Sequence, residues 1–279
     1  MKPIYLALSG GGGHAASHAG VLVEMEGAGI EIGGVVGVSG GALVAAAWAG
    51  GADLRTLVER ASSLHPWTWV RGWGGGLLSG TRLGAMIDES LPIDRFEDLR
   101  VPVKVVATDV DTGQPVVFQS GELRDPVRAS CSFPGVFPPM TIDGRRFYDG
   151  AVAEVSPVGR VREMAGEGGI VVALDCNSGT KWPAADSFVA LALRAGVTMF
   201  RGRSRAELAG ADLVIAPQMG ESSWMQPRRI PAFFEAGRVA LQAALPELRR
   251  LIEEGPRPAN GGLQRPVAEL IPLSRSRRE

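Results

Sequence analysis

A serine flanked by glycines is the first feature of this sequence that could carry out chemistry. Residues 37–41, GVSGG, match the pattern G-x-S-x-G and lie between a predicted strand and a predicted helix. In that context a tight turn projects the Ser39 hydroxyl outward, and the flanking glycines avoid clashes with the neighbouring chain. The alternative is a turn of small residues in which Ser39 only caps the helix. The pattern alone leaves both interpretations open.

A run of four glycines precedes the first predicted helix. Because no side chains obstruct them, their backbone N–H groups can point at one anionic oxygen, as an oxyanion hole requires. The first residue of the helix after Ser39 offers a further donor. The candidate oxyanion donors are Gly10, Gly11, Gly12, Gly13 and Gly40.

The same glycine loop could instead hold a phosphate. Gly10, Gly12 and Ala15 fit the looser dinucleotide fingerprint, with alanine in the third place. However, no acidic residue that could bind a ribose follows the second predicted strand until Asp53, and no Gly-Lys-Ser/Thr follows as in a P-loop. A nucleotide-binding protein is therefore an alternative, but it leaves Ser39 without a role.

The base for Ser39 must be sought outside the histidines. No histidine follows residue 65, so the usual order of serine, acid and histidine cannot be built. Asp149, in the segment FYDGA at 147–151, is the candidate carboxylate, although most Asp-Gly pairs are simple turns. A carboxylate is a weak base near neutral pH, so burial would have to raise its pKa. The histidines of the chain are His14, His18 and His65.

The elements that must position these residues alternate between strands and helices. Longer stretches predict helices at 15–27, 39–49, 187–200 and 233–254, and Asp143-Gly144 predicts a hairpin turn. This alternation predicts an α/β fold with a mainly parallel sheet that helices cover on both faces. Short apolar runs predict strands at 4–8, 34–38, 103–108, 116–119, 170–174 and 213–216.

Composition limits the class of protein. The 279 residues are 45% hydrophobic, which predicts one large domain over 1–255 and a loosely held basic tail over 256–279. A net charge of −1 gives no electrostatic case for nucleic acid, and no ligand spacing suggests a metal or another cofactor. Cys131 and Cys176 form no disulfide framework. With neither a signal peptide nor a membrane-spanning stretch in view, we expect a cytoplasmic protein that contacts membranes at most peripherally.

Two aromatic segments are candidates for that contact. Trp67, Trp69 and Trp73 lie within seven residues, and tryptophan rings suit a membrane interface. Rings packed over the core are the slightly favoured alternative. The segment 223–229 combines Trp224 and Met225 with two arginines and could meet anionic head groups, although a solvated surface loop is the simpler interpretation.

Together, the glycine loop, the serine turn and the late Asp-Gly-Ala resemble the patatin-like phospholipase family, in particular its small bacterial members. The three motifs occur here in the family's order, and the segments 107–113 and 128–139 also resemble the family. The likeness covers Leu6 to Pro157. It implies a three-layer α/β/α sandwich, a Ser39–Asp149 dyad without histidine, and hydrolysis of acyl esters of glycerolipids.

Two departures from the family pattern bear on activity. His14 and Ala15 stand where the family usually has a basic residue and a glycine. After the Asp-Gly the family often has asparagines, whereas this chain continues with AEVSP at 153–157. The alternative to an active enzyme is therefore a regulatory or lipid-binding protein on the same fold, with weakened catalysis.

Overall fold

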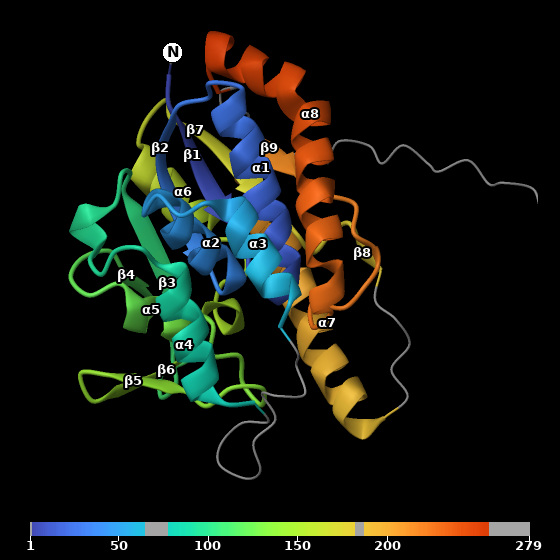
Figure 1. Ribbon diagram of the computed structural model, residues 1–279. Coiled ribbons are helices and arrows are strands. Elements are labelled where there is room, and N and C mark those ends of the chain that lie inside the picture. Colours follow the sequence, from blue (N-terminus) through green and yellow to red (C-terminus); the bar gives the residue numbers. More distant parts are fainter. Residues whose placement is uncertain (1, 65–77, 182–186, 257–279) are drawn as a thin grey trace, which may run out of the picture.

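The computed structural model describes residues 2–64, 78–181 and 187–256 (Figure 1). His65, Trp67, Trp69 and Trp73 lie outside these described residues, as does the tail from residue 257 onward. The membrane contact proposed for the tryptophans and the loose tail therefore stay predictions. None of the helices in the described ranges is long and apolar enough to span a bilayer.

The elements follow one another as strands and helices along the chain (Figure 1). The strands in the described ranges are β1 (Ile4–Leu8), β2 (Ile32–Val38), β3 (Val103–Asp109), β4 (Pro115–Phe118), β5 (Met140–Ile142), β6 (Arg145–Asp149), β7 (Ile170–Leu174), β8 (Thr180–Lys181), β9 (Leu213–Ile215) and β10 (Gly220–Glu221). The α-helices are α1 (Ala16–Gly27), α2 (Gly40–Ala49), α3 (Leu54–Ser62), α4 (Gly80–Ser90), α5 (Arg124–Ser130), α6 (Val158–Ala165), α7 (Phe188–Leu208) and α8 (Ile230–Glu254). The 3-10 turns are η1 (Gly12–Ala15), η3 (Phe96–Asp98), η4 (Gly150–Val152) and η5 (Pro227–Arg229).

The central sheet has the strand order β5-β6-β3-β2-β1-β7-β9, with β4 also paired to β3. Its middle is parallel, because β1 pairs with β2 and β7, β2 pairs with β3, and β7 pairs with β9 in that sense. The β4, β5 and β6 pairings are antiparallel. The predicted mainly parallel sheet is thus confirmed, with an antiparallel end that carries Asp149.

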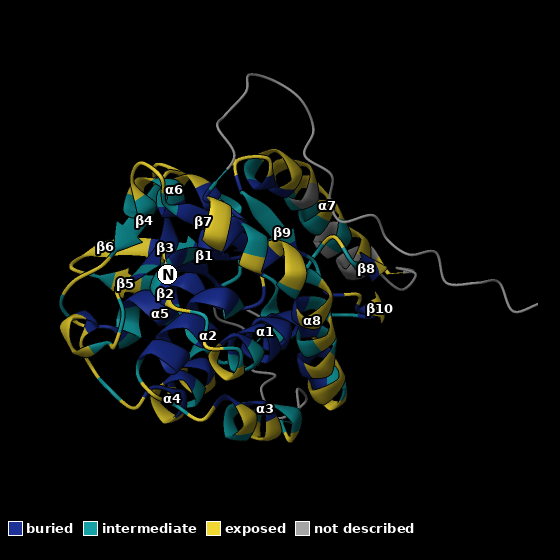
Figure 2. Cartoon of the chain, turned by 90° about the horizontal axis from the view of Figure 1, so that it is seen from above, coloured by how far each residue is buried: buried dark blue, intermediate teal, exposed yellow. Residues whose placement is uncertain are grey.

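Helices cover both faces of this sheet (Figure 2). Alternate residues of β1 separate into two hydrophobic clusters, as the period of a strand requires. Leu6 and Leu8 pack in one cluster with residues of α1, α2 and α8, whereas Ala7 packs in the other with residues of α6 and with Leu208 of α7. The three-layer α/β/α arrangement predicted from the sequence is confirmed.

The register of β3 brings the two candidate catalytic residues together. The β2–β3 pairing ends with Val38 opposite Val106, and Ser39 follows directly. The next residue of β3, Ala107, pairs with Asp149 of β6. A strand has two edges, and β4 pairs with one edge of β3. Beyond Val106, β6 therefore pairs with the same edge of β3 that β2 pairs with before it. Asp149 is therefore placed beside Ser39 by strand pairing.

Several elements differ from those predicted. The helices α3, α4, α5 and α6 were not predicted, and they are only seven to eleven residues long. Helix α7 continues past Phe200 to Leu208, because Ser204 and Leu208 are buried against the rest of the molecule. The predicted turn at Asp143-Gly144 joins β5 to β6, and both residues have positive φ, 48° and 76°.

Candidate active site

Ser39 occupies a strained turn between β2 and α2. Its φ of 53° and ψ of −128° are unusual for a residue with a side chain. The Ser39 N–H donates to Ser130 Oγ at 2.7 Å, and the Ser130 hydroxyl donates to the Val106 carbonyl at 2.6 Å. Ser130 thereby ties the turn to β3. Within the described part of the chain, the Ser39 hydroxyl makes no capping hydrogen bond to α2, so the interpretation as a mere helix cap is wrong.

The glycines around Ser39 are required by close backbone contacts. A Cβ on Gly37 would lie 2.6 Å from Ala42 Cα, and one on Gly40 would lie 2.6 Å from the Gly12 carbonyl oxygen. A Cβ on Gly41 would lie 2.6 Å from the carbonyl oxygens of both Leu8 and Ser9. No side chain fits at these distances without backbone movement.

Asp149 meets the Ser39 hydroxyl from the end of β6. Ser39 Oγ donates to Asp149 Oδ2 at 2.6 Å, and the Ala151 N–H donates to Asp149 Oδ1 at 2.9 Å. The Asp149 N–H donates to the Ser132 carbonyl at 3.0 Å. The following Gly150 approaches β3 so closely that a Cβ there would lie 2.2 Å from the Val106 carbonyl oxygen. Both carboxylate oxygens are thus held in place.

Burial gives Asp149 the properties of a base. Its exposed fraction is 1%, and that of Ser39 is 8%. Burial raises the pKa of Asp149 from its ordinary value to about 7, while the hydrogen bonds from Ser39 and Ala151 lower it by less. The charged carboxylate is disfavoured in the low-dielectric surroundings, so it holds a proton more tightly near neutral pH.

The glycine loop lies beside Ser39, but its four amides are not equivalent. The Gly10 N–H donates to the Val155 carbonyl at 3.0 Å, and the Gly13 N–H donates to the Trp224 carbonyl at 3.1 Å. Among the described residues, the backbone N–H groups of Gly11, Gly12 and Gly40 have no hydrogen-bond acceptor. The candidate oxyanion donors therefore narrow from five residues to these three.

Polar residues after β7 support the glycine loop from below. The Asn177 side-chain amide donates to the Gly10 carbonyl at 2.8 Å, and the Asn177 N–H donates to Asp175 Oδ1 at 3.0 Å. The sequence analysis did not single out these two residues. They follow a buried parallel strand, and ligand sites of α/β sheets lie at the carboxyl ends of such strands. This position in the sequence could have identified them as candidate site residues.

The two described histidines hold the same region together. His14 is buried, its Nε2 lies 3.1 Å from Ser222 Oγ, and its ring packs edge-on against Phe233 at 4.8 Å. His18 Nε2 lies 3.0 Å from the Ser9 carbonyl oxygen. Burial lowers the pKa of His18 to about 4, so this imidazole is neutral at physiological pH and acts as the donor to Ser9.

Helix α7 holds the segment after Asp149, residues 150–157, which we call the base loop. Glu207 Oε2 accepts from the N–H groups of Ser156 and Val155 at 2.7 and 3.1 Å. Arg203 donates to the carbonyls of Val152 and Ala153 at 2.8 and 2.6 Å. These contacts shape the base loop where the chain departs from the family pattern. The Val155 carbonyl in turn accepts from Gly10, so the base loop also supports the glycine loop.

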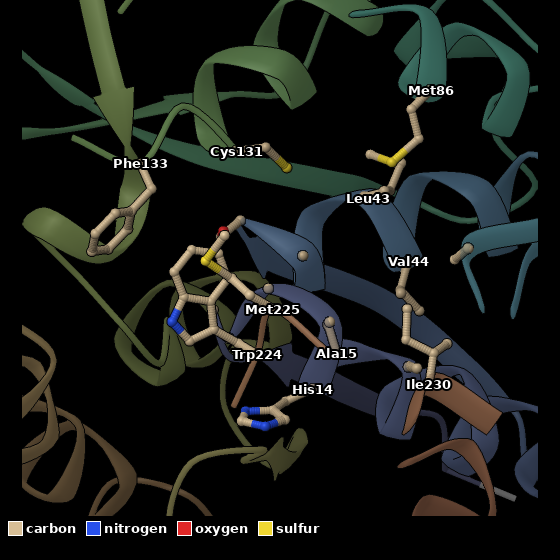
Figure 3. A pocket seen from close by; sticks show the side chains of 18 of the residues that line it. His14, Ala15, Leu43, Val44, Met86, Cys131, Phe133, Trp224, Met225 and Ile230 are labelled. Carbon is tan, nitrogen blue, oxygen red and sulfur yellow. The ribbon is translucent and has the colours of Figure 1, made fainter. Parts of the chain in front are cut away.

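A cavity of about 490 Å³ opens onto Ser39, Asp149 and the glycine loop. Figure 3 shows Phe133, Trp224 and Met225 among the side chains that line it. The Phe133 ring lies between Phe200 of α7 and Trp224, with ring centroids 5.9 and 6.0 Å away. The lining is largely apolar, which suits an acyl chain. Residues that line it include Leu43, Val44, Met86, Phe133, Trp224 and Ile230.

Comparison with known proteins shows the family and the fold of the chain. Uncharacterized NTE family proteins of Mycobacterium tuberculosis and Mycobacterium bovis are 32% identical over 190 residues, 66% of this chain and 52% of theirs, so the chain spans about half the length of these relatives. The neuropathy target esterase sws of Drosophila persimilis is 32% identical over 167 residues, which are 55% of this chain and 11% of that protein. VipD from Legionella pneumophila shares the fold, with a TM-score of 0.53 and 14% identity over 87% of this chain and 67% of VipD. A family model described as patatin-like phospholipase matches residues 6–161, more than half of the sequence, and the chain therefore belongs to the patatin-like phospholipase family.

Proposed function

We propose that the chain is a serine acyl hydrolase that cleaves carboxylic esters of lipids, including phospholipids, with Ser39 as nucleophile and Asp149 as base. The observation that carries this proposal is the 2.6 Å hydrogen bond from Ser39 Oγ to Asp149 Oδ2 at the wall of an apolar cavity. Three backbone N–H groups that have no acceptor among the described residues line the same cavity, as acyl transfer requires.

The first half-reaction forms an acyl-enzyme. Asp149 takes the hydroxyl proton as Ser39 Oγ bonds to the ester carbonyl carbon, and the carbonyl oxygen becomes an oxyanion. The N–H groups of Gly11, Gly12 and Gly40 bind this oxyanion, and each contributes on the order of 3 kcal/mol to stabilising the transition state. The intermediate then collapses, the bond to the leaving alcohol breaks, and Asp149 returns the proton to that alcohol.

The second half-reaction releases the fatty acid. A water molecule gives its proton to Asp149 and attacks the acyl carbon, and the same three N–H groups bind the new oxyanion. The bond to Ser39 Oγ then breaks, and Ser39 recovers its proton from Asp149. A base with a pKa of about 7 suits both directions of this transfer, since it accepts and returns a proton at neutral pH.

The lining of the cavity supports a lipid substrate. Side chains from α2, α3, α4 and α7 form apolar walls on which an acyl chain can lie. The family to which the chain belongs is described as phospholipases, and the Drosophila relatives are called esterases. We therefore assign the substrate to acyl esters of glycerolipids, with the acyl chain in the cavity and its ester carbonyl at Ser39.

Hydrolysis of a short-chain aryl ester and of a phospholipid by purified variants tests the proposal. Ser39→Ala should lower kcat by about 10³-fold or more, because the nucleophile is lost. Ser63→Ala is the matched control, since this serine is exposed just after α3 and its hydroxyl only donates to the Arg60 carbonyl. Turnover by Ser39→Ala equal to that of the control would exclude Ser39 as the nucleophile.

A further inference from the structure

The large apolar side chains exposed in the described ranges lie on α7, on α8 and in the segment that follows β10. Leu191 is 54% exposed and Met199 is 75% exposed, and both belong to α7. Met225 is 38% exposed and lines the cavity. Val239, 62% exposed, lies apart from them on α8. Exposed apolar groups that cluster beside a site indicate a docking surface, whereas an isolated one needs no explanation.

Helix α7 has two different faces. Val197, Phe200 and Ser204 point inward and line the cavity. Successive residues of an α-helix are about 100° apart, so Leu191 and Met199 fall within about 80° of each other on the opposite side, with Ala195 between them. Ala195 is exposed as well. One face of α7 therefore forms a wall of the cavity, and the other presents an apolar strip to the outside. Figure 1 shows α7 at the periphery of the molecule.

The charges of α7 lie at the margins of this apolar strip. The helix carries four arginines and one acidic residue, Glu207, whose carboxylate is bound to the base loop. By the same rotation per residue, Arg194 and Arg205 flank the strip on one side and Arg203 flanks it on the other, each within about 60° of its edge. An apolar strip bordered by arginines is typical of helices that lie in the interface of an anionic bilayer.

We propose that α7 docks the protein on anionic lipid surfaces, with Leu191 and Met199 inserted among the acyl chains and Arg194 and Arg205 at the phosphates. This inference rests on the proposed function, and it specifies that the substrate is lipid within a membrane or aggregate. A lipid surface matches the charge of α7, whereas two copies of this helix packed together would bring arginines next to arginines.

The position of α7 explains how docking serves the site. The helix that would meet the lipid also forms the cavity wall through Phe200 and holds the base loop through Glu207. We therefore expect faster hydrolysis of lipid in anionic vesicles than of the same lipid in neutral vesicles.

Co-sedimentation with vesicles tests the inference. We would compare Leu191→Asp/Met199→Asp with Val239→Asp, all in the Ser39→Ala background so that the lipid is not consumed. On phosphatidylcholine vesicles with about 30% phosphatidylserine, the α7 double variant should partition at least about 10-fold less than the parent, and Val239→Asp should equal the parent. Phosphatidylcholine alone should bind the parent more weakly, by about 10-fold.

Three outcomes would overturn the inference. These are equal partitioning of the α7 double variant and its parent, equal binding to both vesicle types, or sedimentation velocity in which the α7 variant converts a dimer to a monomer. The last result would assign the strip to a contact between copies. Thermal melting checks folding, and Leu191→Ser/Met199→Ser replaces the aspartates if those unfold the chain. Binding that depends on α7 without any ester hydrolysis would leave the docking inference standing and refute the proposed function.

Discussion

The two candidate catalytic residues are held in place by different kinds of contact. Ser39 is fixed by backbone packed against backbone, with Gly37, Gly40 and Gly41 at distances where no Cβ fits. Asp149 is fixed by strand pairing and hydrogen bonds, and the base loop after it is held by side chains of α7. We therefore expect substitutions in the turn around Ser39 to abolish activity or folding. Substitutions around Asp149 and the base loop should reduce activity or stability in smaller, graded amounts.

Among the substitutions that test this difference, Gly41→Ala should have the largest effect on stability and activity. The new Cβ would lie 2.6 Å from two backbone oxygens, Leu8 O and Ser9 O, which cannot move without displacing β1. We expect a loss of about 3 kcal/mol or more in the free energy of unfolding and at least about 100-fold in kcat/KM. Denaturant unfolding and ester hydrolysis measure the two quantities.

Gly159→Ala is the matched control for that variant. Gly159 lies within α6, and no atom lies within 4 Å of the Cβ it would gain. Alanine there should stabilise the protein by about 0.5–1 kcal/mol through lower entropy of the unfolded chain. Similar behaviour of the two variants would contradict the claim that close backbone contact, rather than glycine content, fixes the nucleophile turn.

The raised pKa of Asp149 predicts how the stability of the protein depends on pH. The folded-state pKa of Asp149, about 7, lies above its ordinary value of 3.8, so the folded protein binds more protons than the unfolded chain between these pH values. The free energy of unfolding attributable to this group therefore falls as pH rises through that window and stays low above it. Asp149→Asn removes the buried charge and does not titrate. The free energy of unfolding of this variant, relative to that of wild type, should therefore rise by on the order of 1–3 kcal/mol when the pH is raised from about 4 to about 8.

Urea unfolding of both proteins at the two pH values measures this gain. Glu163, which is exposed on α6, supplies the control substitution Glu163→Gln. That control should show no comparable gain. A difference between Asp149→Asn and wild type that is the same at both pH values would mean that Asp149 titrates as an ordinary carboxyl.

The smallest effect should come from the far end of the base loop. Glu207→Ala removes the acceptor for the N–H groups of Val155 and Ser156. Since Glu207 positions the loop without touching substrate, kcat should fall by about 10-fold with KM nearly unchanged. Glu207→Gln keeps an acceptor oxygen and should recover most of the rate. An equal loss in both variants would show that charge, and not loop position, matters at this residue.

The sequence predicted the local elements of the fold but not the contacts between distant parts of the chain. The bounds of β1 and β7 were predicted correctly, because buried runs of apolar residues in central parallel strands end at small or polar residues. Helices α3 to α6 were missed because they are short. The β5–β6 hairpin could not be placed on the sheet, because its position depends on where β2 stops pairing with β3.

In the candidate site, too, the sequence identified the residues of local motifs but not the distant residues that support them. Ser39, Asp149 and the glycines belong to short local motifs, so the sequence identified them as candidates. Their supports act across the chain: Ser130 lies 91 residues from Ser39, Asn177 lies 167 residues from Gly10, and Glu207 lies 51 residues from Ser156. No local pattern encodes such contacts. The same limit applies to the glycine loop, where only tertiary hydrogen bonds distinguish the Gly10 and Gly13 amides from the rest.

The reaction of Ser39 with a fluorophosphonate probe tests the central claim most directly. The rate of labelling would be followed by intact-protein mass spectrometry from about pH 5 to about pH 9, in wild type and in Asp149→Asn. We predict a single adduct on Ser39, a rate that rises through pH of about 7 as Asp149 loses its proton, and labelling at least about 100-fold slower in Asp149→Asn. Equal labelling of the two proteins would contradict the dyad, and no labelling of folded wild type would favour a regulatory or lipid-binding protein.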